Sequence, residues 1–146
     1  MRDTFLKSVS VIDTETTALV PEKAEIVEVA GASYDGTQWN VTSALFGAKN
    51  GIPPEASAKN NISNRMIKDR ATFAESIDIA KELMDWNNAK YFVAHNCSYD
   101  QAVLSQGFIS ASCNKDVIIA QDPSRWICTH RLAKQLIPHD FKDMQY

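Results

Sequence analysis

Three β-rich segments follow one another at the start of this chain, before any helical periodicity, and this order restricts the folds available to it. Residues 8–13 alternate in polarity and end on an aspartate, and residues 26–34 form a second strand-like run. The Asp35-Gly36 dipeptide is a strong signal for a two-residue turn, and it leads into a third predicted strand over residues 39–46. Three strands joined this closely predict an antiparallel meander.

Helical and strand-like segments alternate in the rest of the chain. We expect a loop over 47–54 and short helical turns at most over 55–70. A capping box at Thr72–Glu75 opens a predicted helix that ends near 87–88, and a strand follows over 90–94. The remaining predicted elements are a helix over Asp100–Gln106 closed by Gly107, a strand or helix over 116–120, a strand over 126–128 and a helix over 129–136. This order predicts an α/β fold, in which a mixed five-stranded sheet is flanked by helices and the later strands run parallel to the first. Since no linker or repeat is evident, we expect a single domain over residues 1–146.

Composition supports a globular chain and excludes several classes of protein. The 146 residues are 45% hydrophobic and carry a net charge of −3 with a pI near 5.6, which argues against a protein that coats nucleic acid by charge alone. No apolar run reaches the roughly 18 residues that a membrane span needs, and the first residues lack the apolar stretch of a signal peptide. Three cysteines without a pairing pattern fit a reducing compartment. We therefore expect a cytoplasmic protein without membrane contact.

Two acids, Asp13 and Glu15, stand two residues apart at the end of the first predicted strand. Side chains at this spacing point to the same face of a sheet, and two carboxylates there repel each other unless a cation lies between them. Hard oxygen ligands of this kind suit Mg²⁺ or Mn²⁺. From the spacing alone, however, two ordinary surface acids at a strand end remain the favoured interpretation.

A second segment, His95-Asn96-Cys97-Ser98-Tyr99-Asp100, runs from a predicted strand into a predicted helix. By itself, Asp100 is explained as an acid that complements the helix dipole, and Asn96 as a turn residue. Taken together with Asp13-Thr14-Glu15-Thr16-Thr17-Ala18-Leu19, the segment resembles the first two motifs of the DEDD exonucleases, the DnaQ-like branch of the ribonuclease H-like fold. That family carries Asp-x-Glu-Thr-Thr-Gly-Leu on its first strand and His-Asn-x-x-Phe-Asp at a later helix start.

Further segments extend the resemblance from about residue 9 onward. Residues 25–30 resemble the family's second strand, and residues 125–129 with Leu132-Ala133 resemble the exonuclease X branch, whose members degrade DNA. The resemblance implies 3′–5′ hydrolysis of terminal phosphodiesters at a site that holds two Mg²⁺ or Mn²⁺ ions. In that site Asp13 would bridge both ions, Glu15 would bind the ion that activates water, and Asp100 would hold the ion at the leaving group.

The resemblance also implies contacts to the terminal nucleotide. The backbone from Thr14 to Thr16 would contact that nucleotide, and the side chains of Thr16 and Asn96 would hydrogen-bond to the 3′ end. Leu19 would be the family's apolar wedge between the last two bases, although ordinary packing at a strand end explains an apolar residue there equally well.

Three departures from the family pattern affect these expectations. Ala18 replaces a glycine, and residues 60–63 read Asn-Asn-Ile-Ser where the family often has His-Gly-Ile-Thr, so a contact to the substrate is expected to differ. The third motif, which supplies the fourth metal-binding Asp and a Tyr or His base, is not recognised before residue 146. His139 and Asp143 are too close to the preceding strand to supply it, and a solvated loop is the preferred interpretation. His95 is expected to be structural rather than the base.

We therefore expect an exonuclease domain that is C-terminally truncated relative to the family, with a two-metal site that is incomplete and activity that is weak or absent. The alternative is a catalytically inactive domain that binds a nucleic-acid end or a partner protein. The expected ligands are single-stranded DNA or 3′ ends, with RNA left open. A homodimer or another partner would cover the incomplete C-terminal side.

Overall fold

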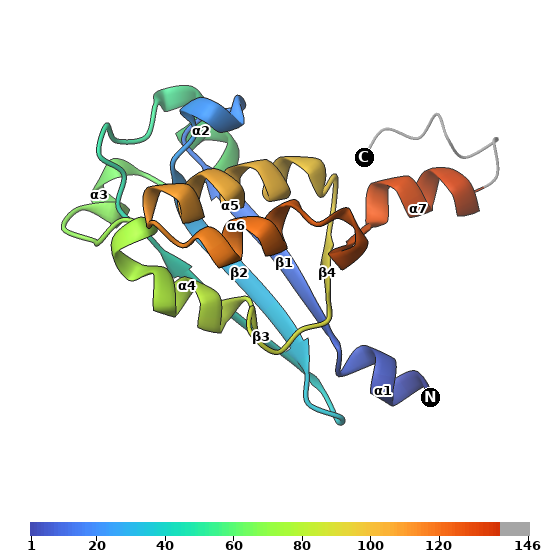
Figure 1. The fold of residues 1–146 in the computed structure, drawn as a ribbon. Coiled ribbons are helices and arrows are strands. Elements are labelled where there is room, and N and C mark those ends of the chain that lie inside the picture. Colours follow the sequence, from blue (N-terminus) through green and yellow to red (C-terminus); the bar gives the residue numbers. More distant parts are fainter. Residues whose placement is uncertain (138–146) are drawn as a thin grey trace.

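A computed structural model describes residues 1–137 and shows a five-stranded mixed sheet with the strand order β3-β2-β1-β4-β5 (Figure 1). The strands are β1 (Val9–Thr16), β2 (Ile26–Tyr34), β3 (Trp39–Leu45), β4 (Tyr91–Ala94) and β5 (Trp126–Cys128). β1 and β3 pair antiparallel with β2, whereas β4 runs parallel to both β1 and β5. The predicted meander and the predicted direction of the later strands are therefore confirmed. His139 and Asp143 lie outside the described residues.

Helices cover one face of this sheet. The helices are α1 (Arg2–Leu6), α2 (Pro54–Asn60), α3 (Asn64–Ile67), α4 (Ile77–Leu83), α5 (Ser98–Ser110), α6 (Asn114–Gln121) and α7 (Thr129–Leu136), with short 3-10 turns at Pro21–Lys23, Ala74–Ser76 and Pro123–Arg125. In Figure 1, α4, α5 and α6 lie in front of the sheet, and α7 projects beyond the β4 side. Of the helices within residues 1–137, none combines the length and apolar character needed to cross a membrane.

The main core fills the space between the helices and the sheet. Its centre is aromatic: the rings of Trp86 and Phe92 stack at 4.4 Å, and Phe108 lies 4.9 Å from Trp86. Ile12 contributes from β1 and is 2% exposed. The indole N–H of Trp86 has a hydrogen-bond partner within this layer: Nε1 donates a hydrogen bond of 2.9 Å to Asp116 on α6. On β1 the residues facing this core are Ser10, Ile12 and Thr14, and Val9 is also buried at the start of the strand.

The opposite face of the sheet carries an apolar row that no described residue fully buries. Its members are successive register partners across all five strands: Val41, Ala32, Val11, Val93 and Ile127. Val41 is the most open of them at 73% exposure. We call this set the open row. It lies directly beside the position of Asp13, which follows Val11 on the same face of β1.

The prediction that Gly107 closes a helix is wrong. Helix α5 continues to Ser110, and a side chain at position 107 would place its Cβ 2.6 Å from a ring carbon of Phe73. The glycine therefore permits close approach of two segments instead of ending one of them. Residues 116–120, left open from the sequence, belong to helix α6.

The helix around residue 80 is shorter than predicted, although its start signal is confirmed. Glu75 accepts hydrogen bonds of 2.8 Å from both the backbone and the hydroxyl of Thr72, and Glu75 N–H donates back to that hydroxyl. A 3-10 turn follows this capping box, so the α-helical part begins only at Ile77 and ends at Leu83. The short helices α2 and α3 match the helical turns expected over 55–70. Helix α1 was not predicted.

Candidate active site

Two of the predicted carboxylates lie at the end of β1, on the face that bears the open row. Along this strand the buried residues Ile12 and Thr14 alternate with Asp13 and Glu15, which are not buried. Partial loss of hydration beside the sheet nevertheless raises the pKa of Asp13. Burial also raises the pKa of Glu15, and the negative charges of Asp13 and Glu28 raise it further. These acids therefore form a region of mutual repulsion.

Glu28 belongs to this region and was not foreseen as part of it. It is the register partner of Glu15 on β2, and like charges directly opposite each other on neighbouring strands destabilise a sheet. The sequence signal that finds it is the antiparallel register of the first two strands. An acid cluster of this kind is stabilised by a bound cation.

The third carboxylate, Asp100, comes to the same edge of the sheet from a distant part of the chain. Because β1 and β4 are parallel, their carboxyl ends lie together, and α5 begins shortly after β4. The Thr14 hydroxyl donates a 2.7 Å hydrogen bond to Asp100 Oδ1 across 86 residues of sequence. Burial raises the pKa of Asp100 to about 6, and the charge of Asp13 adds to this effect. The two predicted motifs are therefore adjacent in space.

These acidic side chains are suitable ligands for a hard divalent cation, although their present positions do not form a complete binding site. Asp13, Glu15 and Asp100 supply only carboxylate oxygens, which are the ligands that Mg²⁺ and Mn²⁺ prefer. As the side chains stand in residues 1–137, however, no three acidic, histidine or cysteine groups converge closely enough to hold an ion. The hydrogen bond from Thr14 uses one lone pair of Asp100 Oδ1, so this carboxylate keeps oxygen lone pairs that a cation could bind.

A cavity of about 400 Å³ opens beside Glu15, between the end of β1 and helix α2. Four of the residues predicted to bind metal or substrate line it, namely Thr14, Glu15, Thr16 and Leu19. Leu19 is 74% exposed and does not pack into the core. Asp13, Asp100 and Asn96 are not among the lining residues that the structure describes. Asn96 occupies the turn after β4 with a left-handed φ of 56°.

Two side chains that sequence reasoning did not assign to the site hold the wall of this cavity. Asn60 Nδ2 donates a 3.3 Å hydrogen bond to the Thr16 carbonyl, and the Tyr99 hydroxyl donates to the Ala18 carbonyl. Asn60 opens the Asn-Asn-Ile-Ser segment noted above as a departure from the family. Its neighbour Asn61 has a φ of 59°, a left-handed conformation that asparagine tolerates better than most residues. The sequence pointed to this segment but not to the contact.

His95 lies at the same edge of the sheet but is engaged elsewhere. Its Nδ1 lies 3.0 Å from the Thr129 hydroxyl, and its ring stacks on His130 with centroids 5.2 Å apart. These contacts join the start of α7 to the turn after β4. They agree with the expectation that His95 has a structural role.

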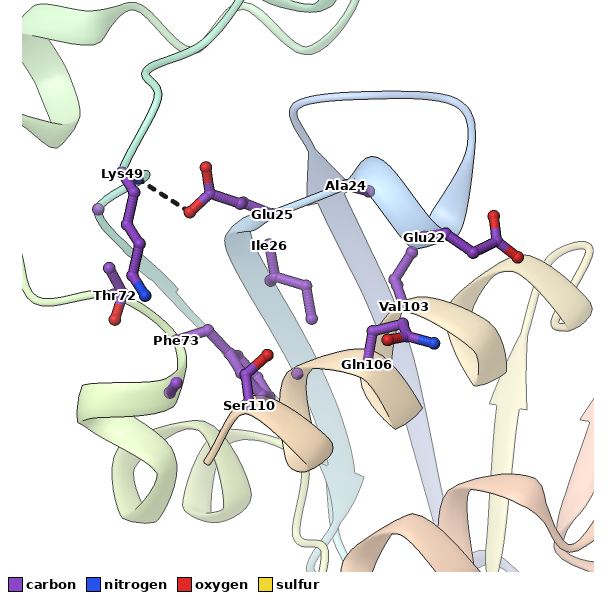
Figure 2. Close-up of a pocket in the computed structure, with 13 residues that line it drawn as sticks. Glu22, Ala24, Glu25, Ile26, Lys49, Thr72, Phe73, Val103, Gln106 and Ser110 are labelled. Atoms are coloured by element: carbon purple, nitrogen blue, oxygen red, sulfur yellow. Dashed lines mark hydrogen bonds between the residues drawn. The ribbon is translucent and has the colours of Figure 1, made fainter. Parts of the chain in front are cut away.

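A second cavity of about 160 Å³ lies on the helix side of the fold (Figure 2). Its walls come from α5 and from residues 22–26, 47–49 and 72–74, and its floor includes Ile26, Phe73 and Val103. Glu25 accepts a hydrogen bond of 2.9 Å from the Lys49 backbone at its rim, drawn as a dashed line in Figure 2. None of the predicted site residues lines it, so the cavity beside β1 is the candidate active site.

Comparison with known proteins gives consistent matches in sequence and structure. The family model described as Exonuclease (RNase_T) matches residues 10–144. Exodeoxyribonuclease 10 of Escherichia coli K12 is 31% identical over 129 residues, which cover 88% of this chain and 48% of that protein. The DNA polymerase III subunit epsilon of Treponema pallidum is 30% identical over 95 residues, which cover 64% of this chain and 42% of that protein. The chain thus spans less than half the length of these relatives.

The fold has solved counterparts as well. A structure of exonuclease X in complex with 5′ overhanging duplex DNA superimposes with a TM-score of 0.64 and 30% identity, covering 90% of this chain and 65% of that one. The match includes the mixed sheet described above, in agreement with the predicted ribonuclease H-like architecture. The resemblance inferred from the motifs around Asp13 and Asp100 is therefore confirmed at the level of the family.

Proposed function

This chain belongs to the exonuclease family, and from that premise we propose that it carries a metal-dependent 3′–5′ exonuclease site acting on terminal phosphodiesters of DNA. One observation carries the proposal: Asp13 and Glu15 on β1 lie beside Asp100 on α5, next to a cavity of about 400 Å³. Carboxylates that are distant in the chain and repel one another in space are typical of a cation site.

Each candidate residue has a task in this proposal. Asp13, Glu15 and Asp100 would hold Mg²⁺ or Mn²⁺, which when bound activates water and stabilises charge on the phosphate. Thr14 orients Asp100 through its 2.7 Å hydrogen bond. The polar wall formed by Thr16, together with Asn96 at the nearby turn, would contact the 3′ end.

The shape of the cavity supports a terminal nucleotide as its ligand. Leu19 projects an exposed apolar side chain at the rim, where it would pack against a base. Backbone groups of Thr14 to Thr16 lie along the adjoining wall. We propose DNA as the substrate because the relatives and the structural match named above are DNA enzymes by name or were solved with DNA.

A cleavage assay tests the proposal against its alternatives. The chain is incubated with a 5′-labelled single-stranded DNA and Mn²⁺, and 3′–5′ laddering that Asp13→Asn abolishes is the expected result. We expect slow turnover, because no described side chain is assigned as a general base and such a base contributes about 10²–10⁴-fold. Binding of the DNA end without laddering would favour the inactive binding domain, and faster cleavage of a matched RNA would overturn the choice of DNA.

We also propose that a second copy of the chain covers the open row in solution. The row includes Val11 and Val41, which are 36% and 73% exposed, and contiguous apolar surface of this kind marks association sites. Helix α7 adds the exposed side chains of Leu132 and Leu136 at the adjoining edge. Sedimentation equilibrium of the wild type and of Val41→Lys checks this, since a dimer through the row is expected to dissociate in the variant.

We also propose that the protein is cytoplasmic. The three cysteines, Cys97, Cys113 and Cys128, are all free thiols. Free thiols are usual in a reducing cytosol, and we place the protein there on this ground.

A further inference from the structure

Side-chain hydroxyls fasten the turn that follows β1 to helix α5. Thr16 Oγ1 donates a 3.0 Å hydrogen bond to the Ala18 carbonyl. The Tyr99 hydroxyl lies 2.5 Å from Thr16 Oγ1 and donates to the same carbonyl. Tyr99 belongs to the first turn of α5 and immediately precedes Asp100. The turn is therefore connected directly to the helix that carries a candidate metal ligand.

Leu19 follows this turn and depends on it for its position. The side chain is 74% exposed and lines the candidate cavity. A side chain so exposed makes few packing contacts, and its place is set by the backbone that carries it. The Thr16 carbonyl is held from the other side by Asn60 on α2 at 3.3 Å. The wall of the cavity is thus held by Asn60 on α2 and by Tyr99 on α5.

We propose that Tyr99 is a positioning residue, whose hydroxyl fixes the turn after β1 so that Leu19 meets the terminal base of the bound strand. This inference rests on the proposed function and deepens it, because it says what holds the apolar contact in place. This role depends on the Tyr99 hydroxyl and not on its ring. Phenylalanine would fill the same space without a donor. A tyrosine hydroxyl has an ordinary pKa of about 10 and is therefore a donor at neutral pH.

The substitution Tyr99→Phe isolates the hydroxyl, and Tyr34→Phe is its matched control. The Tyr34 hydroxyl also donates to a turn carbonyl, that of Gly36 at 3.1 Å, but in the β2–β3 hairpin. We expect Tyr99→Phe to raise KM for a single-stranded oligonucleotide roughly two- to tenfold, the range for one lost hydrogen bond, with kcat within about twofold. Slow chemistry makes KM report the dissociation constant. Tyr34→Phe is expected to leave both constants unchanged.

A substrate without a terminal base separates positioning from general loss of structure. With an abasic 3′-terminal nucleotide, the wild type and Tyr99→Phe are expected to have the same KM, because Leu19 has no base to contact. A double-mutant cycle with Leu19→Ala is expected to be non-additive, since both changes remove the same contact. Thermal unfolding of each variant accompanies these measurements.

The outcomes that overturn the inference differ from those that overturn the proposed function. An active wild type whose KM is unchanged in Tyr99→Phe, or whose KM rises equally for normal and abasic ends, overturns the role of the hydroxyl alone. Additive effects of Tyr99→Phe and Leu19→Ala do the same. A wild type that neither cleaves nor binds DNA ends overturns the proposed function, and this inference with it.

Discussion

The two faces of the sheet differ sharply, and β1 belongs to both. On the helix side, Ile12 and its neighbours Val29 and Phe92 are at most 2% exposed and pack into one aromatic core. On the other side, Val11 is 36% exposed and the next residue on that face is Asp13. Between Ser10 and Glu15, one strand therefore anchors the fold with its even-numbered residues and presents acids at odd-numbered positions, whereas Val9 at its start is also buried. Stability and chemistry are separated by the alternation of a single strand.

This separation of core residues from acids on β1 leads to predictions that mutations can test. Changes on the helix side are expected to alter the free energy of unfolding, whereas changes at the acids are expected to alter activity and leave the fold intact. Such a pattern is common where a site carries groups that repel one another, because function there opposes stability.

The largest effect is expected for Phe92→Ala. The Phe92 side chain is completely buried and contacts Trp86 and Trp126 through ring pairs at 4.4 and 5.3 Å. Removing it leaves a cavity, and such changes cost about 3–5 kcal/mol. Denaturant unfolding followed by tryptophan fluorescence measures the loss, with Phe92→Leu as a control of smaller expected cost. A loss below about 1 kcal/mol would mean that the helix face is not the main core.

The next effect is on activity, for Asp13→Asn. We expect the cleavage rate to fall at least about 100-fold, equivalent to about 2.7 kcal/mol, and Mn²⁺ binding measured by calorimetry to weaken. The free energy of unfolding should stay equal or rise, because the charge of Asp13 raises the pKa values of both Glu15 and Asp100. Glu82→Gln on the exposed surface of α4 is the control. Equal loss of activity and stability in Asp13→Asn would contradict the separation of the two faces.

Asp100 is both a site acid and a buried residue, so the pH dependence of the free energy of unfolding tests how burial acts on it. Burial raises its pKa from 3.8 to about 6, so the folded protein holds this proton where the unfolded chain has lost it. The stabilising contribution is complete below pH 3.8 and is lost as pH rises through 6. At pH 7 we therefore expect metal-free Asp100→Asn to be about 2–3 kcal/mol more stable than the wild type, with Thr14 still donating to the amide oxygen.

This advantage should shrink as the pH falls towards 4. Urea titrations of both proteins at several pH values follow the difference directly. Parallel stability profiles for the wild type and the variant would show that Asp100 is not destabilised by burial.

The smallest effect is expected on the open row. In the monomer, at concentrations where the proposed dimer has dissociated, Val41→Thr should change the free energy of unfolding by no more than about 0.5 kcal/mol, since Val41 is 73% exposed there. Val29→Thr on the neighbouring strand is the matched comparison, because Val29 is fully buried and an unpartnered hydroxyl there costs about 1–3 kcal/mol. Similar losses in both variants would mean that another part of the protein covers the row.

Much of this arrangement could be predicted from the sequence because its signals are local. The meander follows from strand patterns and a tight turn, and the shared face of Asp13 and Glu15 follows from alternation. Gly107 was misjudged because its reason lies in Phe73, which is distant in the chain. Residues 116–120 were undecided because a short apolar run suits either a strand or a helix.

The roles of Asn60 and Tyr99 could not be predicted for the same reason as that of Gly107. Each depends on where α2 and α5 come to rest against the end of β1, and no local pattern encodes that placement. Tyr99 was visible within a motif, but only its hydrogen bond to the Ala18 carbonyl shows what the hydroxyl does.

The hydrogen bond from Thr14 to Asp100 has a consequence for the order of folding. The β1–β2–β3 meander closes through short connections, whereas this bond joins residues 86 positions apart. Contacts that close long loops form late, because their entropy cost precedes their reward. A chain that has formed only its meander would present Asp13 and Glu15 without Asp100. The three acids are thus brought together only at the last stage of folding, when α5 packs against the end of β1.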